Sequence, residues 1–399
     1  MLVGEPLFRI KGLRSAEDTI TLARASRVLI VRLDDIGDVV LTSPLLRELR
    51  MNLPSAWITL VVRPEMLNLV ELCPHVNEII TFDEAAHCAG SPLLRHYHAL
   101  RVSSEHLWPR RFDLAISPRR GEDIHDSKSL VYWSGAQCRV AYSERVTEDN
   151  PPPTPYSDLL LSVAIEQAPP QHEVQSNLDI LRQLGGEVRD DSLELWLSPQ
   201  DQQFADNVYL QNGVKDDDLV IGISPGAGSR RRMWPLQRFI DMAAIMIEKY
   251  KARILVIGGK AEIPLGEAIT ASLGSSVINS TGRATLRQAA ALLSQCTVLL
   301  GNDSGPMHLA AALGVAIVEV SCHSRLGSEA HPHSPTRFGP WQVPSAVLRP
   351  ERPVPPCSTS CLSSEAHCIE GVTTQQVKLA LEGLLEKHCR VHASSSGDK

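Results

Sequence analysis

The sequence predicts an α/β fold made of two doubly wound domains. Apolar runs of strand length alternate with segments of helical periodicity from about residue 27 onward. At 399 residues the chain is also long for one hydrophobic core. We place the boundary within residues 185–218, because the helix expected at 171–184 ends at Gly185 and Gly186.

Four strands are expected in the first half, at residues 28–31, 57–62, 78–82 and 114–117. In residues 85–111 the apolar residues do not recur at a regular interval, so this segment is expected to form a loop with some helix. The proline-rich segment 148–155 is expected to be a surface connection, because proline fixes φ and lacks an amide donor.

The first strand leads into an acidic turn, residues 34–38 (DDIGD). After the turn, apolar residues recur at the spacing expected of a helix. In an open α/β sheet this turn lies at the carboxyl end of the strand, where ligands bind. A turn with one glycine and three carboxylates does not suit a pyrophosphate. Asp38 is instead a candidate general base toward a hydroxyl group, and the alternative is that it caps the helix.

The second half is predicted to contain strands at residues 219–224, 253–257, 276–279, 297–300 and 316–320. Helices are expected between them, for example at 236–250 and 286–293, and Thr285 and Gln288 have capping-box spacing before the latter. Because such strands are parallel, the loops that follow them emerge on one edge of the sheet.

The loop after the first of these strands combines small residues with arginines. Pro225, Gly226 and Ala227 allow backbone amides to approach a phosphate, and the run 230–232 (RRR) supplies guanidinium groups. The alternative is a glycine-rich turn followed by a solvated basic run.

Two further loops add polar groups to this edge. Glu262, beyond a Gly-Gly turn, is expected either to bind ribose hydroxyls or to be a charge at a helix N-terminus. Asp303 or Ser304 caps the next helix, so the amides of Ser304 and Gly305 form an anion site, with His308 one turn further along. His308 is either part of this site or a structural residue. Together the loops indicate a cleft for a diphosphate and its sugar.

No metal site is predicted. Residues 216–218 (DDD) precede a strand and so fall on the opposite edge. The following group has metal-binding side chains, but its spacing does not match a pair of Cys-x2-Cys elements, so free thiols are expected: Cys357, Cys361, His367 and Cys368. With no signal peptide evident, the nine cysteines are expected to be mostly reduced in a cytoplasmic protein, and the net charge of −7 argues against general nucleic-acid binding.

Three motifs carry a resemblance to a known family: the segment 32–46 (RLDDIGDVVLTSPLL), the loop from Pro225 to Trp234-Pro235, and the sequence 303–308 (DSGPMH). In these the chain resembles the glycosyltransferase family that includes the ADP-heptose:lipopolysaccharide heptosyltransferases. The resemblance extends from about Arg27 to Leu385.

The resemblance implies a GT-B fold, in which two Rossmann-like domains face a central cleft. After an N-terminal extension (1–26) come an acceptor-side domain (27–200), a nucleotide-sugar-binding domain (201–355) and a tail with cysteines and a helix (356–399). It also implies inverting transfer of a heptose or related sugar from an ADP-sugar to a lipopolysaccharide core or related glycan, without metal or cofactor. Asp38 is then the base, and Arg232 stabilises the leaving diphosphate.

The resemblance further implies a lipid-linked or oligosaccharide acceptor and a peripheral contact with the cytoplasmic face of the inner membrane. Arg119, Arg120 and Lys128 are candidates for binding such an acceptor, or form a solvated rim. Arg232 stands where the family commonly has lysine, which differs in geometry.

Three other functions are considered: transfer from a different nucleotide-sugar, non-catalytic binding of nucleotide or glycan, and dehydrogenase activity. The missing GxGxxG motif disfavours the last of these.

Overall fold

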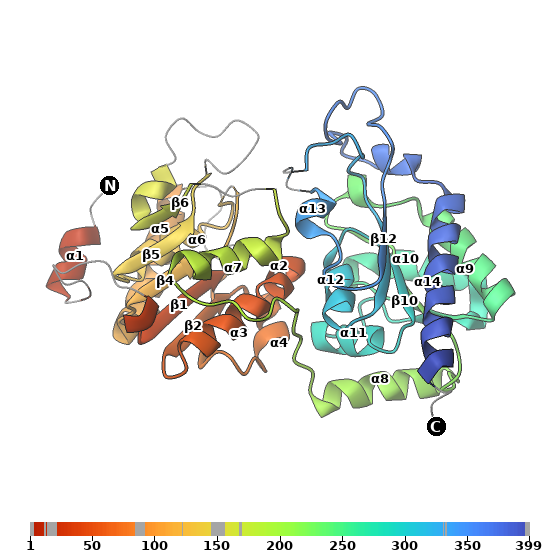
Figure 1. Ribbon diagram of the computed structural model, residues 1–399, viewed down its shortest axis with the longest axis horizontal. Coiled ribbons are helices and arrows are strands. Elements are labelled where there is room, and N and C mark those ends of the chain that lie inside the picture. Colours follow the sequence, from red (N-terminus) through yellow and green to blue (C-terminus); the bar gives the residue numbers. More distant parts are fainter. Residues whose placement is uncertain are drawn as a thin grey trace. The chain divides into compact units, whose positions relative to one another are not determined.

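The computed structural model describes residues 4–11, 13, 22–83, 92–121, 123–144, 156–166, 170–329, 331 and 333–395. The chain divides into two compact units, Met1–Asp191 (unit 1) and Ser192–Lys399 (unit 2). In Figure 1, unit 1 runs from red to yellow-green and unit 2 from there to blue. The segment 148–155, expected to be a surface connection, lies outside the described residues.

Unit 1 contains a six-stranded sheet with the order β3-β2-β1-β4-β5-β6, in which all neighbouring strands are parallel. The strands are β1 (Arg27–Arg32), β2 (Trp57–Val62), β3 (Glu78–Thr81), β4 (Leu114–Ser117), β5 (Cys138–Tyr142) and β6 (Val163–Ile165). The strand order reverses between β1 and β4, where Val28 pairs with Ile58 on one side and Leu114 on the other.

The α-helices of unit 1 are α1 (Gly4–Ile10), α2 (Ile36–Leu41), α3 (Ser43–Asn52), α4 (Leu67–Val70), α5 (Pro92–Val102), α6 (Ser127–Trp133) and α7 (Glu173–Gln183). Shorter turns are η1 (Leu22–Arg24), η2 (Pro64–Met66), η4 (Trp108–Arg110), η6 (Tyr156–Leu160) and the π-helical η3 (Ser103–Leu107). Residues 92–110 are helical throughout, so the region predicted as a loop with some helix contains more helix than expected, and residues 85–91 of that prediction lie outside the described residues.

Two strands of unit 1, β5 and β6, were not predicted from the sequence. For β5 the reason is a charged residue within the strand. Arg139 is the second residue of β5 and interrupts its apolar pattern. Its guanidinium is buried and donates to the carbonyl oxygens of Ala136 (3.0 Å) and Leu160 (2.8 Å). These hydrogen bonds satisfy the charged group inside the fold.

Unit 2 contains a second parallel six-stranded sheet, with the order β12-β11-β10-β7-β8-β9. Its strands are β7 (Val220–Ser224), β8 (Arg253–Val256), β9 (Val277–Asn279), β10 (Val298–Asn302), β11 (Ala316–Val320) and β12 (Ser345–Leu348). Five of the six were predicted to within two residues at each end, and only the half-exposed edge strand β12 was missed.

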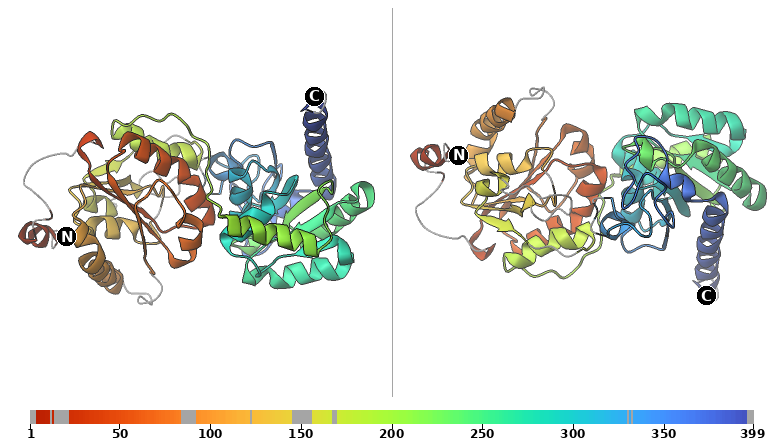
Figure 2. Two further views of the ribbon diagram at one scale, coloured as in Figure 1. Left: turned by 90° about the horizontal axis from the view of Figure 1, so that it is seen from below. Right: turned by 90° about the horizontal axis from the view of Figure 1, so that it is seen from above.

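The α-helices of unit 2 are α8 (Pro199–Gln211), α9 (Leu236–Tyr250), α10 (Ile263–Leu273), α11 (Leu286–Leu293), α12 (Gly305–Ala312), α13 (Pro335–Phe338) and α14 (Thr374–Ser395). Short 3-10 turns are η7 (Arg230–Arg232), η8 (Lys260–Glu262), η9 (Gly274–Ser276) and η10 (Cys368–Gly371). The capping box of α11 is confirmed, with both hydrogen bonds between Thr285 and Gln288 present. Figure 2 shows α14, in dark blue, standing out from the rest of unit 2. Among the described residues, no helix has the length and apolar content needed to cross a bilayer.

Both sheets have the Rossmann strand order 3-2-1-4-5-6, counted within each unit. In such sheets ligands bind beyond the carboxyl ends of the strands, at the point where the order reverses. That point lies between β1 and β4 in unit 1, and between β7 and β10 in unit 2. The loops after these four strands are therefore the places where function is expected.

Candidate functional site

In unit 1, the acidic turn after β1 places Asp38 inside helix α2 rather than at its cap. Asp35 is the N-cap residue, with extended backbone angles, and Asp38 is the third residue of the helix. The alternative that Asp38 caps this helix is therefore wrong. Its side chain is 24% exposed, and Oδ1 accepts a hydrogen bond of 3.0 Å from Nη2 of Arg32. The carboxylate is thus held in place while part of it stays accessible.

Arg32 forms ion pairs with two carboxylates of this turn, those of Asp34 and Asp38. It ends β1, its side chain is only 1% exposed, and Nε lies 3.3 Å from Oδ2 of Asp34. Its Nη2 also lies 4.0 Å from Oε1 of Glu173, a buried residue of α7. A buried guanidinium needs such carboxylates to offset its lost hydration. Neither Arg32 nor Glu173 was predicted from the sequence, although an arginine that ends an apolar strand is a detectable signal.

The loop after β4 brings a second cation to the same turn. Arg119 Nη1 donates to Oδ1 of Asp34. The next residue, Arg120, is buried, and its Nη1 lies 3.4 Å from Oγ of Ser176. The loops after β1 and β4 therefore meet at the switch point of unit 1, and the alternative of a solvated rim is wrong for Arg120.

Lys128 belongs to the interior of unit 1. Its side chain is 1% exposed, and Nζ lies 3.6 Å from Oε1 of Glu144 and 3.9 Å from Oδ1 of Asp158. A lysine so enclosed is neither solvated nor presented to a large ligand. The solvated-rim alternative is wrong here too, and these ion pairs give Lys128 a structural role.

In unit 2, a buried asparagine joins the two loops predicted to share an edge. Asn302 ends β10, and its Nδ2 donates to the carbonyl oxygens of Pro225 (2.9 Å) and Gly226 (3.3 Å). Its Oδ1 accepts from the backbone N–H of Trp234 (3.0 Å). Because β7 and β10 are parallel neighbours, the predicted adjacency of their loops is confirmed. Asn302 itself was not singled out from the sequence.

The three arginines after β7 have different surroundings. Arg230 is 75% exposed and pairs with Glu365 at 3.3 Å. Arg232 is mostly buried, and its Nη1 lies 3.3 Å from Oδ2 of Asp303 in the loop after β10. A β-carbon at Gly228 would lie 2.8 Å from Nη2 of Arg232. The solvated-run alternative therefore describes Arg230 and not Arg232.

Arg231 contacts a histidine that was not predicted from the sequence to belong to the site. Its Nη2 lies 3.2 Å from Nε2 of His333, which follows β11 on the same edge of the sheet. Burial, followed by the positive charge of Arg232, lowers the pKa of His333 to about 4. The imidazole is therefore neutral near pH 7 and accepts the hydrogen bond from Arg231. The segment 331–334 (HPHS) in a loop at the predicted edge was an available signal.

Glu262 lies directly beneath the loop after β7. A β-carbon at Gly226 would lie 2.4 Å from Cγ of Glu262, so a larger residue here would force the Glu262 side chain to move. Oε2 of Glu262 accepts a 2.8 Å hydrogen bond from the N–H of Gly259 and caps η8. The role at a helix terminus is thus observed, and a ribose contact stays a prediction.

Helix α12 begins at the predicted anion site. Ser304 is its N-cap residue, Gly305 and Pro306 occupy the first turn, and Oγ of Ser304 donates to the carbonyl oxygen of Asn302 at 3.2 Å. The first N–H groups of a helix have no partner within it, so the amides of Ser304 and Gly305 are available to an anion at this end of α12. His308 lies one turn in, as predicted, and is buried.

Comparison with known proteins identifies related chains. A model of the family described as "Glycosyltransferase family 9 (heptosyltransferase)" matches residues 123–362. Lipooligosaccharide heptosyltransferase 2 of Haemophilus ducreyi is 24% identical over 334 residues, which is 81% of this chain and 88% of that protein.

Solved structures share the fold. A glycosyltransferase family 9 protein from Veillonella parvula superposes with a TM-score of 0.73 at 22% identity, covering 93% of this chain and 99% of that one. The E. coli ADP-heptose lipopolysaccharide heptosyltransferase II gives a TM-score of 0.66 at 20% identity, covering 90% and 99%. These likenesses and the two Rossmann-like sheets show a GT-B fold. The family model matches more than half of this chain. The chain therefore belongs to glycosyltransferase family 9, the heptosyltransferase family, and is a glycosyltransferase.

Proposed function

We propose that this glycosyltransferase moves a heptose from ADP-heptose to a lipopolysaccharide core or related glycan, with inversion and without a metal at the reacting centre. Family membership supports heptose transfer, and two of the relatives named above, those from Haemophilus ducreyi and E. coli, are heptosyltransferases of lipooligosaccharide or lipopolysaccharide. The observation that carries the proposal is the joining of the loops after β7 and β10 by Asn302, which holds Arg232 beside the start of α12.

Unit 2 is proposed to bind the donor. The loop containing Pro225, Gly226 and Ala227 is one wall of the site, and the amides of Ser304 and Gly305 at the start of α12 are donors for the diphosphate. Glu262 lies against the first of these loops, where its second carboxylate oxygen is proposed to accept from a ribose hydroxyl.

Arg232 is proposed to neutralise the departing diphosphate. Its contact with Asp303 fixes the guanidinium in one orientation, and its planar fork of donors suits two phosphate oxygens. A fixed positive charge at the position where negative charge develops lowers the barrier, and it supplies what a divalent metal would otherwise provide. His308, within α12, is proposed to support the anion site from inside the helix.

Asp38 in unit 1 is proposed as the general base. As the acceptor oxygen attacks the anomeric carbon, the hydroxyl proton passes to the carboxylate, and the bond between that carbon and the diphosphate oxygen breaks. A single displacement of this kind inverts the anomeric configuration. The hydrogen bond from Arg32 orients the carboxylate for this step.

The acceptor is proposed to be anionic and lipid-linked or an oligosaccharide, and the partly exposed Arg119 in the loop after β4 is proposed to contact it. The enzyme is accordingly proposed to work at the cytoplasmic face of the inner membrane. The second candidate function is transfer from another nucleotide-sugar, which the arginine at position 232 leaves open because the family commonly has lysine there.

A thermal-shift panel of ADP, GDP, UDP and CDP tests the donor assignment. ADP is expected to raise the melting temperature most, and Arg232→Ala is expected to abolish most of that shift. Arg230→Ala is the matched control, because this arginine of the same run is exposed and should leave the shift intact. A full ADP shift in Arg232→Ala, or equal loss in both variants, would remove the assignment, and a larger shift with another nucleotide would favour the second candidate.

A further inference from the structure

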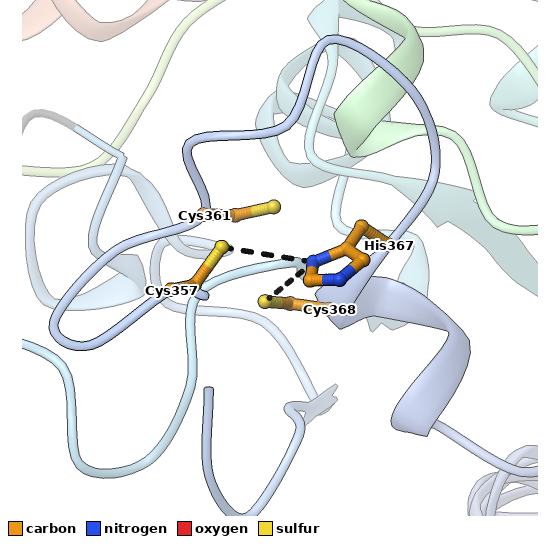
Figure 3. Close-up of side chains that lie close together, drawn as sticks. All are labelled: Cys357, Cys361, His367 and Cys368. Atoms are coloured by element: carbon orange, nitrogen blue, oxygen red, sulfur yellow. Dashed lines mark hydrogen bonds between the residues drawn. The ribbon is translucent and has the colours of Figure 1, made fainter. Parts of the chain in front are cut away.

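Three cysteines and a histidine converge in unit 2, although their sequence spacing did not indicate a metal site; the thiols are free, as predicted. They lie in the connection between β12 and α14, and all are buried or half-buried: Cys357, Cys361, His367 and Cys368. Figure 3 shows their side chains directed toward one another. One potential ligand atom from each lies within 4.8 Å of the others, and none of the three thiols is in a disulfide.

The distances match those of tetrahedral metal coordination. Zn–S bonds of about 2.3 Å and Zn–N bonds of about 2.0–2.1 Å place sulfur and nitrogen roughly 3.5–3.6 Å apart across a tetrahedron. Nδ1 of His367 lies 3.6 Å from Sγ of Cys357 and 3.5 Å from Sγ of Cys368. These separations therefore accommodate an ion between the ligands with little rearrangement.

The surrounding backbone suits thiolates. The N–H of Leu362 donates to Sγ of Cys357, and the N–H of Val354 donates to Sγ of Cys368, each at 3.4 Å. Hydrogen bonds of this kind stabilise negative sulfur and orient metal ligands.

The competing explanation is that the cysteines are small apolar residues of the core, which contains all three. Cys296, a buried thiol elsewhere in unit 2, illustrates that role, since among the described residues its polar contacts are the carbonyl oxygen of Leu292 and the hydroxyl of Tyr209. A purely apolar role does not require an imidazole nitrogen between two sulfur atoms. The position of His367 favours a metal site.

We propose that Cys357, Cys361, His367 and Cys368 bind one Zn²⁺ ion as a structural site. Soft thiolates with one imidazole in a tetrahedral arrangement select zinc among common divalent ions. Four protein ligands leave no position open for substrate, so the ion has no part in the transfer chemistry.

The segment that carries the four ligands, residues 357–368, and the residues directly after it contact the start of α9 and the arginines that precede that helix. Nη1 of Arg231 lies 3.4 Å from the carbonyl oxygen of Cys361, and Arg238 Nη1 donates to the carbonyl oxygen of Glu370 at 2.7 Å. The indole N–H of Trp234 donates to the carbonyl oxygen of Val372 at 2.9 Å. The ion would thus fix residues 357–368, which have few regular backbone hydrogen bonds of their own, against this part of unit 2.

Metal content of the full-length chain tests the proposal directly. The protein is purified without metal-chelate chromatography in a reducing, metal-free buffer, and its zinc, iron, nickel and copper are measured by mass spectrometry. We expect about one zinc per chain, either as purified or after incubation with zinc and removal of the excess. Less than a few tenths of zinc under both conditions would overturn the proposal, and so would stoichiometric iron in its place.

Variants locate the ion. Cys361→Ser is expected to lose most of the zinc, whereas Cys296→Ser, a change to a buried thiol of the same unit outside the cluster, is expected to retain it. If Cys361→Ser does not fold, an organomercurial titration of the wild-type protein replaces it, and zinc release should be complete when three thiols have reacted. Full zinc in Cys361→Ser, equal loss in both variants, or zinc that survives modification of every thiol would each refute the site.

Discussion

Replacement of Asp38 by asparagine separates a chemical role from a structural one. The amide keeps the size of the side chain and an oxygen that can accept from Arg32, but it cannot take up the acceptor proton. Loss of a general base typically slows a reaction by about 10²–10⁴-fold, which is about 2.7–5.4 kcal/mol of barrier. Turnover of Asp38→Asn is therefore expected to fall at least about 100-fold.

The structure limits how much stability the same change can cost. Asp38 is not the N-cap of α2, and buried Arg32 retains Asp34 at 3.3 Å and Glu173 at 4.0 Å. The guanidinium therefore keeps compensating charges, and the cost should lie near 1 kcal/mol, well below the roughly 3–5 kcal/mol for an unpaired buried charge. The substitution also removes the favourable interaction of a negative charge in the first turn with the helix dipole, which contributes about 0.3–1 kcal/mol to stability.

The assay measures heptose transfer at saturating donor, together with the ADP thermal shift and urea unfolding. Asp35→Asn is the matched control, since Asp35 belongs to the same turn but is 81% exposed and makes no side-chain capping bond. It is expected to retain turnover within a few-fold. Near wild-type turnover in Asp38→Asn would show that Asp38 is structural, and the base would then be sought at Asp34 or Asp35.

Three further predictions follow from the described contacts. Gly226→Ala places a methyl group 2.4 Å from Cγ of Glu262, so we expect a raised KM for the donor and a loss of about 1–3 kcal/mol in urea unfolding; unchanged values for both would contradict this close approach. Lys128→Met leaves the carboxylates of Glu144 and Asp158 without their buried cation, so the free energy of unfolding should fall by about 3 kcal/mol, and a stable variant would refute the structural role. Transfer should persist in a brief assay with excess EDTA, with bound zinc measured in the same sample; activity restored only by magnesium or manganese would contradict metal-independent chemistry.

Much of the fold was predictable because parallel strands buried on both faces appear as continuous apolar runs. Residues 57–62, 114–117 and 316–320 were assigned with the bounds that the structure gives to β2, β4 and β11. Parallel connectivity alone then predicts that the loops after β7 and β10 lie on one edge, and the pairing of these strands confirms it. The motifs in these loops carried the family resemblance.

Other features depended on the tertiary structure, because they pair residues that are distant in sequence. The buried position of Arg32 between Asp34, Asp38 and Glu173 is complete only when α7 packs against α2 and α3 and brings Glu173 to it. Whether an arginine is a solvated charge or a fixed one is decided by its neighbours, which differ for Arg230 and Arg232.

The cysteine cluster shows the same dependence most clearly. Sequence spacing identifies a metal site only when its ligands come from regular knuckles. Here the ligands lie on an irregular loop and on η10, and the path of the chain between them brings sulfur and nitrogen atoms within 4.8 Å of one another. A tetrahedron of ligands is a relation between points in space, so residue types and intervals alone could not reveal it.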